Sequence, residues 1–180
     1  MVIIMTVLLG AQVAFADSEN TGKSINIRTD ALLLAGGNLN GEVDFKLGRS
    51  FTVGPMVGTR HASASIAGLD IYKESGLVAA ARGNWYLSGE ALQDSFIVSP
   101  ILGMGAFTYE ALDTKVSQTG LYGALMLSYQ MVWKSGLNVN AGAGMNYLGT
   151  GGSDTEDVAF VEPIYSGLRP TIEVTLGYAI

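Results

Sequence analysis

The sequence contains no cysteine, a single histidine and few charged residues, which make up 14% of its 180 positions. Without cysteine the chain can form neither a disulfide framework nor a thiolate metal site, and a zinc site would depend on that one histidine. The net charge is negative, −6 at pH 7, which makes nucleic acid an improbable partner. We therefore expect no metal, no cofactor and no nucleic-acid partner.

Long hydrophobic runs are missing after the first residues. Residues 1–16 (MVIIMTVLLGAQVAFA) carry no charge, have an apolar centre and end in an Ala-x-Ala pattern, so we predict a secretory signal peptide there. Beyond it no run approaches the roughly 20 apolar residues of a spanning helix. A helical membrane protein is therefore not expected, although 48% of the chain is hydrophobic. We predict that residues 17–180 form one mature domain.

The chain has alternating polar and apolar residues instead. The last stretch places apolar side chains at every second position: Ile172, Val174, Leu176, Tyr178 and Ile180. A strand sends successive side chains to opposite faces, so this stretch predicts a strand with one purely apolar face. The same period predicts eight strands, over residues 25–34, 42–47, 51–60, 77–87, 96–107, 121–133, 137–147 and 169–180. The fold we predict is all-β, an eight-stranded antiparallel up-and-down transmembrane β-barrel.

Outward-facing aromatic residues gather at one end of the predicted strands. They are Phe51, Trp85, Phe96, Trp133 and Tyr178. Aromatic side chains collect where a membrane meets water, so these five predict an aromatic girdle. Short turns at 48–50, 88–95 and 134–136 fall at the same end, whereas the stretches 61–76, 110–119 and 149–167 are predicted as longer loops at the other. We expect a bacterial outer-membrane protein with both termini in the periplasm.

Charged residues of the strands fall on the face opposite to the apolar one. They are Arg28, Asp30, Glu42, Asp44, Lys46, Arg60, Arg82 and Glu173. Four positive charges balance four negative ones, which predicts an interior ion-pair network. On the lipid face an Arg or Lys near the midplane would cost roughly 2–4 kcal/mol. Side chains can fill the lumen of an eight-stranded barrel, so we expect a plugged barrel rather than a porin.

Three segments resemble an uncharacterised family of small outer-membrane barrels: 41–47 (GEVDFKL), 82–87 (RGNWYL) and 98–103 (VSPILG). In its overall pattern the mature chain also looks like the outer-membrane protein A, X and W families. The resemblance implies a monomer among outer-membrane lipid and lipopolysaccharide, inserted by the barrel-assembly machinery through its C-terminal strand. The chain departs from this pattern because its last residue is Ile180, whereas such barrels commonly end in Phe. That family brings no agreed activity with it.

One constellation suggests chemistry. His61, Ser63 and Glu74 are similar to the His-x-Ser and Glu of outer-membrane lipid A deacylases, in which a carboxylate-oriented histidine activates the serine. The position after the serine is Ala64, where that family has Asn, and the motif falls on the third strand rather than late in the chain. We therefore expect a non-enzymatic barrel with a structural or surface-interaction role. The alternatives are a hydrolase that uses these three residues, and a carrier or conduit for a small apolar ligand.

Overall fold

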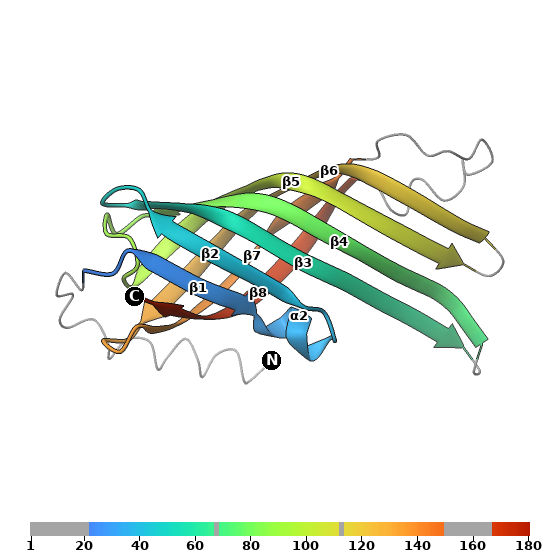
Figure 1. Cartoon of the computed structure of the whole chain (residues 1–180), viewed down its shortest axis with the longest axis horizontal. Coiled ribbons are helices and arrows are strands. Elements are labelled where there is room, and N and C mark those ends of the chain that lie inside the picture. Colours follow the sequence, from blue (N-terminus) through green and yellow to red (C-terminus); the bar gives the residue numbers. More distant parts are fainter. Residues whose placement is uncertain (1–21, 67–68, 112–113, 150–166) are drawn as a thin grey trace.

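The barrel closes through eight strands. The computed structural model describes residues 22–66, 69–111, 114–149 and 167–180, so the predicted signal peptide over 1–16 and nearly all of the predicted loop 149–167 lie outside the described residues. The strands follow one another around the barrel in chain order, and β1 pairs with β8 to complete the ring (Figure 1). Every neighbouring pair is antiparallel. The predicted all-β architecture of eight antiparallel strands is confirmed.

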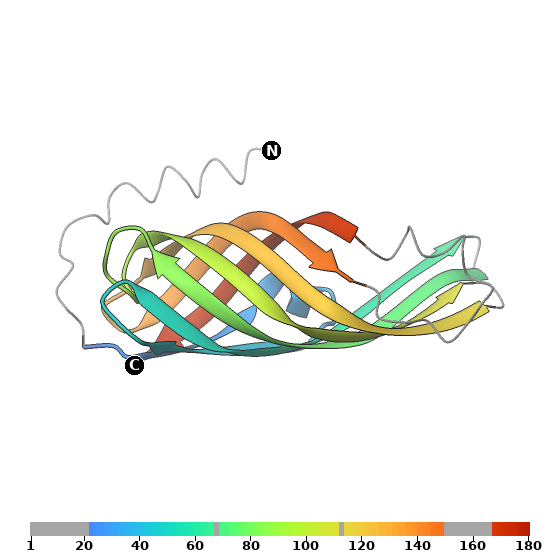
Figure 2. The same ribbon diagram turned by 90° about the horizontal axis from the view of Figure 1, so that it is seen from above.

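The strands differ in length. The shorter ones are β1 (Ile25–Asp30), β2 (Asn40–Lys46), β7 (Leu137–Leu148) and β8 (Gly167–Ala179). The longer ones are β3 (Phe51–Ile66), β4 (Leu69–Tyr86), β5 (Ser95–Ala111) and β6 (Thr114–Val132). These four run beyond the closed barrel as a projecting sheet (Figure 2).

The prediction of loops over 61–76 and 110–119 was wrong for most of these residues. The pairing of β3 with β4 and of β5 with β6 continues through them, for example between Ser63 and Lys73 and between Thr108 and Ser117. Both faces of the sheet carry polar residues there, so the polar and apolar alternation that marks a half-buried strand is absent. The backbone ladder needs no such alternation, because its hydrogen bonds come from the main chain.

A short helix replaces the end of the predicted first strand. The helix α2 (Ala31–Ala35) follows β1 directly, and the Asp30 carboxylate caps it by accepting from the backbone N–H groups of Leu32 and Leu33 at 2.8 and 3.2 Å. Alanine and leucine are strong helix formers, and the run lacks β-branched residues. The strand predicted over 25–34 therefore ends at Asp30. In the described part of the chain no helix has the length and apolar character to cross a membrane.

The barrel wall is apolar outside and polar inside, as the alternation predicts. On the outer surface the hydrophobic side chains of all strands remain exposed, with Leu102, Leu125 and Ile172 at 62%, 57% and 70%. Inside, charged and amide side chains are almost completely buried, among them Arg28, Asp44, Arg82, Asn84 and Asn138. Buried polar groups beneath an exposed apolar surface are the reverse of the usual water-soluble arrangement.

The five aromatic residues predicted as a girdle share one end of the barrel. Phe51 and Trp85 are direct partners in β3 and β4, and Phe96 meets Tyr129 edge-on with ring centroids 4.9 Å apart. Trp133, in the connection between β6 and β7, and Tyr178, near the end of β8, lie at the same end of the barrel. All five side chains are exposed. Both the start of β1 and the C-terminus are here (Figure 1).

The connection between β4 and β5 packs against inward-facing side chains at this end of the barrel. Leu92 is completely buried and forms a small cluster with Tyr86, Ala91 and Ile97. Its backbone has a φ of 63°, a strained conformation for a residue with a branched side chain. At the same end Lys23 donates through Nζ to a main-chain oxygen at 2.9 Å, and burial lowers the pKa of this ammonium group.

Gly54 offers a test of how tightly the strands pack. A Cβ at this position would lie 1.6 Å from the carbonyl oxygen of Val43 in β2, whereas a Cβ at Gly41 would meet nothing within 4 Å. Replacing Gly54 by alanine should lower the free energy of unfolding by at least about 1–3 kcal/mol, because the backbones must separate. Gly41→Ala should leave it unchanged or slightly raised, since alanine restricts the unfolded chain. Urea unfolding of the refolded chain in detergent, followed by tryptophan fluorescence, measures both; equal midpoints would contradict the prediction.

Candidate functional site

A network of ion pairs occupies the interior of the barrel. Arg28 of β1 lies between two carboxylates of β2, with Nη2 2.6 Å from Glu42 Oε1 and Nε 3.1 Å from Asp44 Oδ2. The side chains of Arg28 and Asp44 have no exposed surface. Charges buried in this way are tolerated only when they are paired and hydrogen-bonded.

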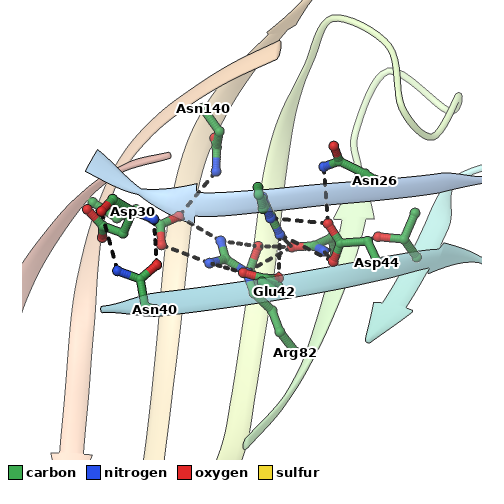
Figure 3. Close-up of polar contacts among 12 residues, drawn as sticks. Asn26, Asp30, Asn40, Glu42, Asp44, Arg82 and Asn140 are labelled. Atoms are coloured by element: carbon green, nitrogen blue, oxygen red, sulfur yellow. Dashed lines mark hydrogen bonds and ion pairs between the residues drawn. The ribbon is translucent and has the colours of Figure 1, made fainter. Parts of the chain in front are cut away.

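Arg82 connects opposite walls of the barrel. It projects from β4 and binds Glu173 of β8 with two hydrogen bonds, Nη1 to Oε2 at 2.8 Å and Nη2 to Oε1 at 2.6 Å. In the order of strands β4 and β8 are four positions apart, so this pair spans the lumen. Nη1 also lies 3.6 Å from Glu42 Oε2, which joins the two arginine clusters into one network (Figure 3). Paired N–H donors match the geometry of a carboxylate and make such bonds strong.

Asparagine side chains complete the network. The Asn84 amide donates to Asp44 Oδ1 at 2.8 Å, and Asn26 donates to the other oxygen of the same carboxylate at 3.3 Å. From β7, Asn138 donates to Asn26 at 2.8 Å. Asn140, also on β7, donates to Glu173 at 3.2 Å (Figure 3). These asparagines fall on the same face as the predicted inward charges, but the prediction of the network was based on charged residues alone. The recurrence of Asn at alternate inward positions could have indicated this role. A count of charged residues does not include it.

Three of the eight residues predicted for the network lie outside it. Asp30 caps α2, Lys46 lies 3.6 Å from Glu90 in the β4–β5 connection, and Arg60 Nε lies 2.7 Å from Glu74. The remaining five are two arginines and three carboxylates, so the predicted balance of four against four does not describe this cluster. The cause is position along the strands: Lys46 is at one end of its strand, and Arg60 lies at the other end of the barrel, where the projecting sheet begins.

Two cavities adjoin these residues. A small one of about 50 Å³ lies between the network and α2 and is lined among others by Arg28, Leu33, Glu173 and Thr175. It has room for a water molecule. The larger is an open trough of about 540 Å³ on the projecting sheet, lined by Gly36, His61, Ser63, Lys73, Glu74, Ser75, Thr108 and Glu110.

The trough contains the three residues of the hydrolase hypothesis but does not arrange them for catalysis. His61 pairs with Ser75 across the strands, and Ser63 pairs with Lys73. Glu74 lies between those two partners in β4, so its side chain points to the opposite face of the sheet. There it forms its ion pair with Arg60. The structure therefore does not bring the Glu74 carboxylate to His61.

Neither a search for metal-binding groups nor comparison with known proteins assigns a function to the site. Within the described ranges no group of three His, Asp or Glu side chains is placed to hold a metal ion. No family model matches the chain, and no match was found among curated proteins or solved structures. Interpretation of the site therefore depends on its geometry.

Loss of Arg82 tests whether the network holds the barrel together. Arg82→Gln leaves Glu173 buried without its cation, which should cost about 3–5 kcal/mol of unfolding free energy. Replacing both residues by methionine should cost less than Arg82→Met alone, because no orphaned carboxylate is left. The matched control is Arg49→Gln, since Arg49 is 83% exposed and lies 3.5 Å from Glu90; an exposed pair of this kind contributes about 0–1 kcal/mol. Denaturant unfolding in detergent measures all four variants, and equal losses for Arg82→Gln and Arg49→Gln would contradict the prediction.

Proposed function

We propose that this protein is a non-enzymatic β-barrel of a bacterial outer membrane. In this proposal its ion-paired interior closes the lumen, and its projecting sheet and loops lie outside the cell. The observation that carries the proposal is the apolar outer surface around a charged interior. In water such a barrel would expose its apolar side chains to solvent while its polar groups are removed from it. In a bilayer the apolar side chains contact lipid and the polar groups stay paired inside, so both are placed favourably.

The extent of the apolar surface fits a bilayer. On β6 the outward residues from Leu121 to Met131 are uncharged, and this is the length of a spanning strand, about 9–11 residues. The aromatic girdle borders this surface at one end. At the other end the outward residues become polar, with Ser75, Thr108 and Thr119 next to the apolar band. An apolar band between an aromatic border and a polar rim is the arrangement of membrane barrels.

The proposed role is that of a rigid anchor for the projecting sheet. Its interior holds paired charges and fully buried side chains such as Arg82, Tyr86 and Gln130, which favours a closed lumen over a conducting one. The termini would lie in the periplasm with the girdle, among outer-membrane lipids. The hydrolase alternative lacks comparable support because Glu74 faces away from His61.

Charge substitutions on the outer face test the membrane proposal. Leu125→Arg places a charge within the apolar band, where it should cost about 2–4 kcal/mol of folding free energy in a bilayer. Ser117→Arg, on the same face of the same strand but in the polar rim, should cost about 0–1 kcal/mol. Folding into phosphatidylcholine vesicles, read from the shift in gel mobility between boiled and unboiled samples, measures both. A wild-type chain that is soluble and monomeric without detergent, or equal effects of the two arginines, would contradict the proposal.

A further inference from the structure

The small cavity between the interior network and α2 is bordered by polar groups that lack a partner. Arg28 Nη1 and Thr175 Oγ1 are buried, and within the described part of the chain neither atom has a hydrogen-bond partner. Both residues line this cavity of about 50 Å³. Their exposed fractions are only 2% and 3%, so bulk solvent does not reach them freely. In folded proteins such buried groups are nearly always hydrogen-bonded, because an unmade bond is costly.

A carboxylate oxygen at the same cavity also lacks a close donor. Glu42 lines the cavity, and its Oε1 accepts from Arg28 Nη2 at 2.6 Å. Its other oxygen, Oε2, lies 3.6 Å from Arg82 Nη1 (Figure 3), which is too far for a hydrogen bond. Asparagine amides add donors to the other two carboxylates of the network, Asp44 and Glu173. Among the described residues none does so for Glu42, so its second oxygen needs a donor from elsewhere.

Water fits this cavity in size and in polarity. A buried water molecule needs about 10–15 Å³, so the cavity has room for more than one. Water can accept from Arg28 Nη1, donate to Glu42 Oε2 and exchange a hydrogen bond with the Thr175 hydroxyl, and two to four polar partners are what a buried water requires. The lining contains both arginines and carboxylates. A neutral ligand therefore avoids the repulsion that an anion or a cation would meet.

We propose that this cavity is a hydration site, and that its water molecules are part of the interior network. They accept from Arg28 of β1, donate to Glu42 of β2 and bond to the hydroxyl group of Thr175 in β8. The site thus connects β8 to the ion pair between β1 and β2 at the place where α2 follows β1. This inference goes beyond the proposed function and does not depend on it, because the cavity lies inside the barrel whichever medium surrounds the outer face.

Deletion of single hydroxyl groups tests the proposal, because a hydrated hydroxyl and a dry one respond in opposite directions. Thr175→Val removes Oγ1 with little change in shape. If the hydroxyl is bound to water, the unfolding equilibrium constant should rise by roughly fivefold, the effect of one lost hydrogen bond. If it is dry, the constant should fall, because a buried group without a partner has been removed. Urea unfolding of the refolded chain in detergent measures the change.

Ser128→Ala is the matched control. Ser128 Oγ is also buried without a hydrogen-bond partner among the described residues, but Ser128 does not line this cavity. Its removal should leave the unfolding equilibrium constant unchanged or lower it. An unchanged or lower constant for Thr175→Val, or a rise of equal size for both variants, would overturn the hydration site.

A crystal structure of the wild-type chain gives a second readout that does not depend on the folding of a variant. At a resolution that shows ordered water, it should contain water oxygen within hydrogen-bond distance of Arg28 Nη1 and Glu42 Oε2. A cavity without such density would refute the proposal. Exchange of sodium for choline at constant ionic strength should leave the urea midpoint of wild type unchanged. A lower midpoint in choline would indicate a small cation in the cavity and would overturn the assignment to water.

Discussion

The ion pair between Arg82 and Glu173 is the constraint on which the interior depends, because it joins opposite walls of the barrel. Long charged side chains need space beside them, and each of three buried ones has a glycine as its direct partner in the neighbouring strand: Arg82 with Gly54, Arg28 with Gly177 and Glu173 with Gly142. A side chain at Gly177 would collide with Asn138 and Arg28. The glycines of the inner face are therefore part of the network, and the close approach of strands at Gly54 is a consequence of the same arrangement.

Alternation along the sequence was sufficient to predict the barrel, its inner and outer faces and the grouping of its aromatic residues. The signal is strong because outward-facing and interior positions differ sharply in polarity. It failed at Ala31–Ala35, where consecutive leucines satisfy a strand or a helix equally and the Asp30 cap decides. It also failed in the projecting sheet, where a strand that is polar on both faces cannot be distinguished from a loop by hydrophobicity.

The composition of the network was less predictable than its existence. A count of inward charges says nothing about their height along the barrel, and Lys46 and Arg60 lie toward opposite ends of their walls. Pairing also depends on neutral donors contributed from distant strands, such as Asn140 on Glu173, and these contacts require the three-dimensional closure of the sheet. In a setting of low dielectric constant every carboxylate oxygen needs a donor, so amides are as necessary as arginines.

The unequal lengths of the strands create the projecting sheet and leave an edge that the chain has to cover. Because β1 and β2 are short, the edge of β3 would be unpaired where the barrel ends, and the α2–β2 connection covers its beginning: Thr59 donates to the Leu39 carbonyl at 2.7 Å, and Asn38 accepts from the backbone of His61. Beyond His61 the sheet projects with polar residues on its outer face. Polar and charged side chains suit an edge that must not aggregate.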